Sequence, residues 1–254
     1  MTIIFKGIDC FLCYNNKEML TRVELCLMLE YILFFSVIAT ISFVPIIGPY
    51  ISMFNTMVHE SAHALVATLT GGQVVAISIF RNTSGLAEFR HRSWFGRVLT
   101  YAAGYPLASV FSVAYLYALS MDLFLYVGMA IFLLLAYNLL FWVRNLVGWI
   151  WVLTVILGLS FLYYNEYMYW YEIVLNIIGL SLLVQAFITC WIIFVLSVKQ
   201  RDQAGDTTML AKSTFLPASF WGFTFLAQGT VFFIMGSLIW FGFDPVKRII
   251  EIVF

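Results

Sequence analysis

Residues 58–65 of the chain read Val58-His59-Glu60-Ser61-Ala62-His63-Ala64-Leu65, within the apolar stretch 49–70. On an α-helix, positions i and i+4 fall on one face, so His59 and His63 can direct two imidazole nitrogens at one metal ion. Glu60 is rotated around the helix, where its carboxylate can reach a water molecule on that metal. Three polar groups at membrane depth are costly unless something binds them, which favours a metal site over a chance match.

The composition places this helix in a membrane. Of the 254 residues, 63% are hydrophobic and only 10% are charged, whereas soluble domains carry about 25% charged residues. We therefore expect an integral, multi-pass protein whose surroundings are the lipid bilayer. The formal net charge of zero gives no indication of a nucleic-acid partner.

Apolar runs separated by short polar breaks predict an all-α polytopic protein with about seven transmembrane helices. We expect these spans roughly at 26–46, 49–70, 97–119, 122–143, 146–163, 172–197 and 214–241. The expected domains are a short cytoplasmic N-terminal segment at 1–25, a single membrane-embedded domain at 26–243 and a short tail at 244–254. The first segment lacks the compact apolar core of a cleavable signal peptide.

The basic residues predict an orientation. With seven spans and a cytoplasmic N-terminus, eleven of the thirteen Lys and Arg residues fall on the cytoplasmic side, and only Lys247 and Arg248 fall on the other. This is the positive-inside pattern. We expect a bacterial-type plasma membrane with the motif near its cytoplasmic face; an even number of spans or a re-entrant segment is the alternative.

A catalytic zinc usually has three protein ligands and one open position, so a third ligand must lie at the depth of the motif. Asp202 and Asp206 lie at the cytoplasmic junction before the last predicted span, and Glu30 lies at the first. Position favours Asp206, although Asp206 is as well placed to cap the helix that follows it. His91 stands in a basic segment and has the character of a surface loop residue.

The segment after the motif predicts a β-hairpin. Gly71-Gly72 ends the helix, residues 73–80 are β-branched with partial alternation, and residues 86–89 can return as a second strand after a turn at 81–85. A strand edge beside a metal site can bind an extended peptide by main-chain hydrogen bonds. The alternative is an ordinary cytoplasmic loop, because two-stranded hairpins are marginal alone.

Several segments together resemble a known family. They are the motif at 58–65, the Thr70-Gly71-Gly72 stop, the stretch Leu99-Thr-Tyr-Ala-Ala-Gly-Tyr-Pro106, and the stretch Gly205-Asp-Thr-Thr-Met-Leu-Ala-Lys-Ser-Thr214. In these segments the chain resembles the M50 metallopeptidases, the site-2 protease-like intramembrane zinc proteases, and in particular their M50B-like branch. The resemblance runs from about residue 50 to 240, but the Asn-Pro-Asp-Gly-like sequence of better-studied site-2 proteases is missing.

The resemblance implies a zinc endopeptidase of membrane proteins or peptides. One zinc ion would be held by His59, His63 and Asp206, and Glu60 would be the catalytic general base that activates water. Two alternatives stay open. One is a non-catalytic membrane protein of the same fold. The other is a metal transporter, which needs a second ligand-bearing span that the sequence does not offer.

Overall fold

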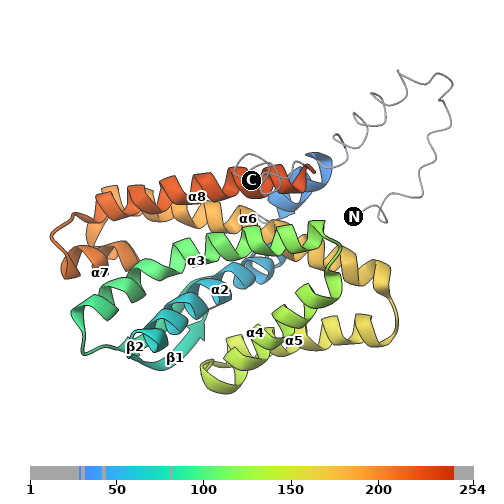
Figure 1. Ribbon diagram of the computed structural model, residues 1–254, viewed down its shortest axis with the longest axis horizontal. Coiled ribbons are helices and arrows are strands. Elements are labelled where there is room, and N and C mark those ends of the chain that lie inside the picture. Colours follow the sequence, from blue (N-terminus) through green and yellow to red (C-terminus); the bar gives the residue numbers. More distant parts are fainter. Residues whose placement is uncertain (1–28, 30–31, 42–43, 81, 243–254) are drawn as a thin grey trace, which may run out of the picture.

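The computed structural model describes residues 29, 32–41, 44–80 and 82–242 (Figure 1). After a short apolar helix at Ile32–Ile41, the elements follow in the order α2 (Ile47–Leu69), β1 (Gln73–Ile79), β2 (Gly85–Arg90), α3 (Trp94–Ser120), α4 (Phe124–Phe141), α5 (Leu146–Tyr164), α6 (Met168–Lys199), a single 3₁₀ turn at Arg201–Gln203, α7 (Gly205–Ser213) and α8 (Ala218–Trp240). The expected helical membrane fold with a small hairpin is thus confirmed. Residues 1–25, 244–254 and Glu30 lie outside the described residues, so the domain limits stay a prediction.

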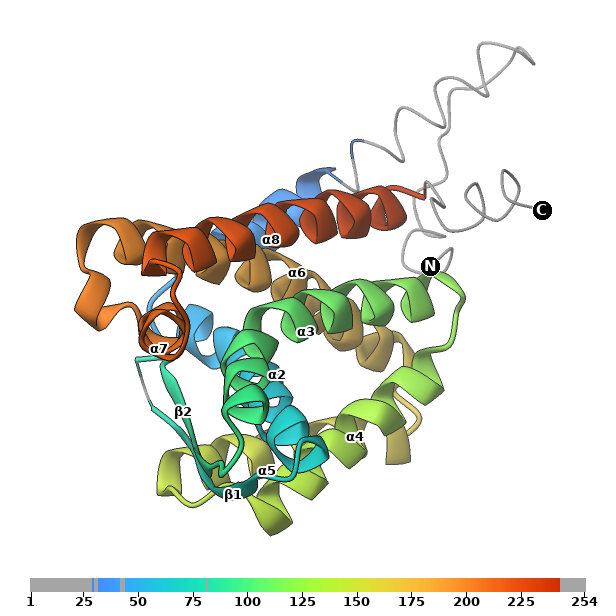
Figure 2. The ribbon, with the colours of Figure 1, turned by 60° about the vertical axis from the view of Figure 1, so that its left-hand side comes forward.

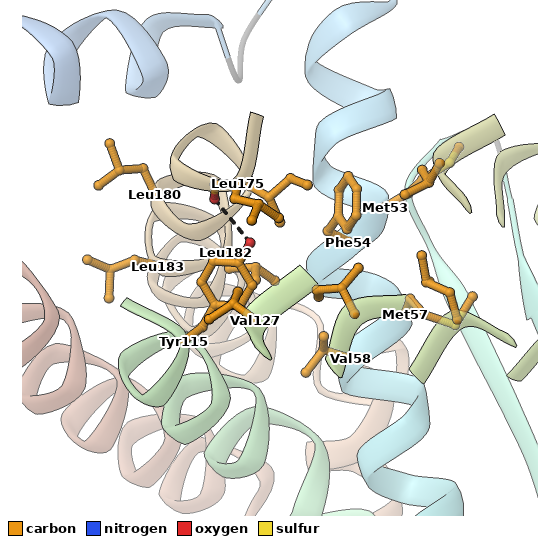
Figure 3. Close-up of a cluster of buried hydrophobic side chains, with 14 of the residues drawn as sticks. Met53, Phe54, Met57, Val58, Tyr115, Val127, Leu175, Leu180, Leu182 and Leu183 are labelled. Carbon is orange, nitrogen blue, oxygen red and sulfur yellow. Dashed lines mark hydrogen bonds between the residues drawn. The ribbon is translucent and has the colours of Figure 1, made fainter. Parts of the chain in front are cut away.

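Helix α2 packs against α3, α6 and the hairpin (Figures 1 and 2). The core beside it is apolar: Met57 of α2, Leu116 of α3 and Leu175 of α6 are at most 2% exposed. Figure 3 shows α2 side chains facing those of α3, α4 and α6, together with the hydrogen bond in which the Tyr115 hydroxyl donates to the Leu175 carbonyl over 3.0 Å. Burying such side chains contributes about 1.5–3 kcal/mol each where water is the alternative. This packing fixes the position of the motif helix.

The predicted number of spans is wrong for the described residues. Five helices are long and apolar enough to cross a membrane, namely α3, α4, α5, α6 and α8. The expected span 49–70 forms α2, but α2 carries the polar residues of the motif and buries them against other helices, so α2 does not need a lipid-compatible surface. The expected span 26–46 is described only in part, as the short helix Ile32–Ile41. The five apolar helices indicate an integral membrane protein.

The end of α2 and the start of the hairpin follow the prediction. Gly71 adopts a φ of 77°, which glycine reaches without steric cost. Its amide donates to the Thr68 carbonyl, and the Gly72 amide donates to the Ala67 carbonyl over 2.7 Å. This pair of bonds ends a helix and turns the chain sharply. Strands β1 and β2 then pair antiparallel, with Ile77 opposite Ala87 and Ile79 opposite Gly85.

All Lys and Arg residues that the structure describes lie in or beside the loops at the end of the fold that holds the hairpin and α7. They are Arg90, Arg92, Arg97, Arg144, Lys199, Arg201 and Lys212. The turns at the other end, α3–α4 and α5–α6, carry the acids Asp122 and Glu166 instead. This charge asymmetry agrees with the positive-inside pattern. The orientation itself, and the kind of membrane, stay predictions.

Candidate metal centre

Two imidazole rings meet on one turn of α2. His59 and His63 are four residues apart in an uninterrupted helix, and their Nε2 atoms lie 3.0 Å apart. The side chains are 14% and 4% exposed, respectively. The helical spacing therefore directs two nitrogens of the kind that bind metal ions at one point in the protein interior.

A carboxylate from the distant helix α7 reaches the same point. Oδ2 of Asp206 lies 3.2 Å from His59 Nε2 and 3.1 Å from His63 Nε2. Asp206 does not cap α7, because Ala204 occupies the N-cap position and the N-cap residue makes no side-chain capping hydrogen bond. Within this turn, the Thr208 hydroxyl accepts a hydrogen bond from the Ala204 amide over 3.1 Å. The turn between α6 and α7 thus directs Asp206 at the two histidines.

The charge of Asp206 is stabilised by the two rings. Burial opposes ionisation of this carboxyl, but the positive charge of a protonated His63, together with hydrogen bonds from both imidazoles, outweighs that effect and holds the pKa of Asp206 below its usual range. An ionised carboxylate is the form that binds a metal ion. Asp206 is therefore in the required protonation state at neutral pH.

The geometry of the three atoms fits a tetrahedral metal ion. Two ligands held about 2.0–2.1 Å from a tetrahedral ion lie roughly 3.3 Å apart. The three observed separations are 3.0, 3.1 and 3.2 Å. Among the described residues, His59, His63 and Asp206 are the group of His, Cys, Asp and Glu side chains that can share one metal ion. Two imidazoles and one carboxylate form a donor set typical of zinc.

A main-chain carbonyl group of α3 sets the orientation of the His63 ring. Its Nδ1 donates a hydrogen bond to the Thr100 carbonyl over 2.6 Å, which leaves Nε2 of the neutral ring as a lone-pair donor toward the metal position. The Thr100 hydroxyl donates to the Gly96 carbonyl and accepts from His91 Nε2, over 2.9 Å in each case. His91 thus lies in a loop, as the sequence predicts, but its ring is half-buried and supports Thr100. Burial, and then the charge of Arg97, lower the pKa of His91, which favours its neutral form.

A glycine on α3 leaves the space in which the three ligand atoms meet. A Cβ atom at Gly104 would lie 2.5 Å from His63 Nε2 and 2.6 Å from His59 Nε2, well inside van der Waals contact. The next residue, Tyr105, packs its ring edge-on to His59, with 4.5 Å between the ring centroids. The Gly104-Tyr105 pair therefore forms one wall of the metal position.

Glu60 lies beside the three ligands in a cavity of about 780 Å³. The side chains of His59, His63 and Asp206 line the same cavity, together with β2 and parts of α3, α6 and α7. Glu60 is 6% exposed, and its carboxylate approaches the backbone amide of Ala87. A Cβ at Gly85 would lie 2.6 Å from Cγ and 2.7 Å from Cδ of Glu60, so glycine at this position leaves room for the carboxylate.

Strand β2 presents its unpaired edge to this cavity. The far edge of β1 is already bonded: Ile77 exchanges hydrogen bonds with Trp142 and Arg144, and Ile79 does so with the Asn145 side chain. Because the peptide groups of Ile77 and Ile79 point away from β2, their partners Ala87 and Gly85 must point theirs away from β1. The contact of the Ala87 amide with Glu60 agrees with this direction. The outward N–H and C=O groups of β2 thus border the candidate metal centre, and the Ala87 N–H among them already contacts Glu60.

Comparison with known protein families gives a match over most of the chain. The family described as Peptidase M50B-like matches residues 28–236, which is most of the chain. The chain belongs to this family. No curated protein and no solved structure matches it.

Of the other acids proposed for the third ligand of this M50B-like chain, the structure describes only Asp202. Asp202 lines the cavity at the 3₁₀ turn but is not part of the ligand group. Glu30 lies outside the described residues. The polar residues of the middle helices have structural partners: Asn138 accepts a hydrogen bond from Ser61 on the back of the motif, and Asn145 holds β1.

Two contributors to the M50B-like site carry no signal of their own in the sequence. Thr100 acts through its main-chain carbonyl, which any residue could supply. Gly85 reads as a turn residue, whereas its role here is to leave space for Glu60. For the wall of the metal position, the sequence contains only a weak signal, which is that Gly104 lies on the helix that follows the motif.

Proposed function

We propose that this chain is an intramembrane zinc endopeptidase that hydrolyses peptide bonds of membrane-associated substrates. The observation that carries the proposal is the meeting of His59, His63 and Asp206 beside Glu60, in a cavity bordered by the free edge of β2. The M50B-like family supports a membrane peptidase. One zinc ion per chain, these ligands and the endopeptidase activity are our proposal.

The three ligand residues would hold zinc and leave one position open on the cavity side. Zinc, when bound, acts as a Lewis acid that lowers the pKa of water and polarises a carbonyl group. Asp206 and the two imidazoles supply the ligand atoms, and Thr100 keeps His63 in the tautomer that binds metal.

Glu60 would act as general base and then as general acid. Its carboxylate takes a proton from the attacking water as the water oxygen bonds to the scissile carbonyl carbon. When the C–N bond breaks, the same carboxyl group donates that proton to the leaving amine nitrogen. A carboxylate that is 6% exposed and next to the Ala87 amide is held in one place for both transfers.

The edge of β2 would hold the substrate in the conformation that cleavage requires. A peptide bond inside a helix is enclosed by its own hydrogen bonds, so the substrate must become extended before attack. The peptide groups of Gly85 and Ala87 offer an extended chain a strand to pair with. Such a chain would run along the cavity past Glu60.

The site favours this reading over the two alternatives. A transporter needs a relay of sites across the membrane, and the described residues hold one group that could bind a metal ion. A non-catalytic protein of the same fold would have no use for a buried Glu60 beside the ligand atoms. A comparison of wild type with Glu60→Gln distinguishes the non-catalytic protein from a protease.

The test compares wild-type chain, Glu60→Gln and Gly158→Ala in membranes of a host cell. A Cβ at Gly158 would meet nothing within 4 Å, which makes Gly158→Ala a neutral control. All three proteins should contain one zinc ion per chain by mass spectrometry. Labelling of new protein N-termini should reveal cleavage products with wild type and Gly158→Ala, reduced about 10²–10⁴-fold with Glu60→Gln. The same products at equal levels with Glu60→Gln would refute the proposed function.

A further inference from the structure

Asn55 is a buried side chain of α2 without a hydrogen bond. It lies four residues before His59 and is 4% exposed. Its Oδ1 is fully buried and has no hydrogen-bond partner, and neither Asn55 side-chain atom bonds to any residue that the structure describes. Asn55 also lines the cavity that holds Glu60 and the three ligand residues.

This lack of partners is unusual for α2. The neighbouring Thr56 hydroxyl donates to the Thr83 carbonyl over 2.7 Å, and Ser61 donates to the Met57 carbonyl over 2.6 Å. Buried polar groups in proteins are nearly always bonded, because an unbonded amide loses its hydration and gains nothing in return. Because Asn55 lines the cavity and its Nδ2 keeps some exposed surface, this nitrogen is placed to bond to a group that enters the cavity.

The position of Asn55 indicates what that partner is. Residues 55 and 59 lie on one face of α2, a turn apart, so Asn55 extends the row of functional groups by one helical turn. The bond between Thr56 and Thr83 ties the hairpin turn to α2 next to Asn55. A peptide paired with Gly85 and Ala87 of β2 would therefore run through the cavity that Asn55 also lines.

We propose that Asn55 is a substrate-binding residue that forms hydrogen bonds with a main-chain peptide group of the extended substrate. The Nδ2 of the carboxamide is a hydrogen-bond donor, which matches the C=O of a peptide strand. Asn55 thus binds the strand from the side that β2 leaves unpaired. This inference rests on the proposed function, because it takes an extended peptide as the occupant of the cavity.

Two hydroxamate inhibitors distinguish the contribution of Asn55 to binding from that of the metal centre. Acetohydroxamate binds a metal ion through its hydroxamate group alone, whereas a dipeptidyl hydroxamate adds main-chain peptide groups. The purified full chain is loaded with Co²⁺ in detergent, so that the visible spectrum reports both metal coordination and inhibitor binding. The variants are Asn55→Leu, which keeps the shape and removes the polar atoms, and Asn176→Leu. Asn176 is 0% exposed and also has an unbonded Oδ1, but it does not line the cavity.

We expect Asn55→Leu to lower the affinity for the dipeptidyl hydroxamate about tenfold, which is the contribution of one hydrogen bond. The affinity for acetohydroxamate should fall by less than about twofold. Asn176→Leu should bind both as wild type does. An unchanged cobalt spectrum in Asn55→Leu shows that the site is intact. Equal affinity of wild type and Asn55→Leu for the dipeptidyl compound would overturn the role of Asn55 and leave the proposed function standing. A wild-type protein that binds neither Co²⁺ nor acetohydroxamate would overturn the proposed function itself, and the inference with it.

Discussion

Replacing Gly104 by alanine should abolish tight metal binding while leaving the fold intact. The added Cβ would lie 2.5 Å from His63 Nε2 and 2.6 Å from His59 Nε2, on the face of α3 that closes the metal position. In an ordinary helix the same change is favourable, because alanine is a better helix former than glycine by about 0.8–1.0 kcal/mol. Any loss of metal binding therefore reports on the site and not on helix α3.

The size of the effect follows from the distances. Ordinary van der Waals contact begins at 3.4 Å, so each ring nitrogen has to retreat by about 0.8–0.9 Å, whereas zinc–ligand distances tolerate about ±0.2 Å. The hydrogen bond from His63 Nδ1 to the Thr100 carbonyl, at 2.6 Å, holds that ring against such a movement. Disturbing the group that orients a ligand typically costs 10–100-fold in metal affinity, and two ligands are displaced here, so we expect a loss of about 100-fold.

The assay is competition for Zn²⁺ between the purified protein and a coloured chelator, with thermal unfolding measured on the apo-protein. Gly158→Ala is the matched control: it makes the same substitution in helix α5, where a Cβ meets nothing within 4 Å. Gly158→Ala should bind zinc and unfold as wild type does, and cooperative thermal unfolding of apo Gly104→Ala would show that this variant keeps its fold. A Gly104→Ala protein with wild-type zinc affinity would show that the three residues do not share a metal ion at this point.

Two further changes test the third ligand and the support of the hairpin. Asp206→Asn should lower the zinc affinity at least about tenfold in the same competition assay, since it removes the charge of a ligand. Asp202→Asn, in the same cavity, should leave the zinc affinity unchanged. A larger loss with Asp202→Asn than with Asp206→Asn would contradict the ligand set. Asn145→Ala removes two hydrogen bonds to the Ile79 backbone. We therefore expect a loss of about 1–3 kcal/mol in the free energy of unfolding and slower cleavage of substrate. Unchanged cleavage would mean that the edge of β2 does not hold substrate.

The motif helix and the hairpin could be predicted because their signals are local. The spacing of His59 and His63 places both rings on one face of any α-helix. Gly71 and Gly72 end α2 with the hydrogen bonds that a positive φ permits, and the β-branched run after them forms β1. Each of these features depends on residues a few positions apart, so the sequence alone contains the necessary information.

The count of spans failed because burial is not local. A hydrophobic run predicts a span when the helix faces lipid, but α2 is lined by other helices and can carry Asn55, His59, Glu60 and His63. For His91, the basic neighbours correctly indicated a loop but not the contacts of its half-buried ring. In the structure, Gly72 and Gly96 leave room for its ring beside Thr100.

The sequence by itself determined that the chain lies in a membrane, that one helix carries two histidines and a glutamate in register, and that a hairpin follows this helix. Only the tertiary structure brought Asp206 rather than Asp202 to the histidines, because these two aspartates have the same side chain and differ only in where the fold places them. The turn between α6 and α7 brings Asp206 Oδ2 to within 3.2 Å of both rings across more than 140 residues of sequence. Contacts between distant segments likewise produce three other features of the site: the space at Gly104, the outward edge of β2 and the unbonded amide of Asn55. The reason is that the cavity forms only where several segments of the chain meet.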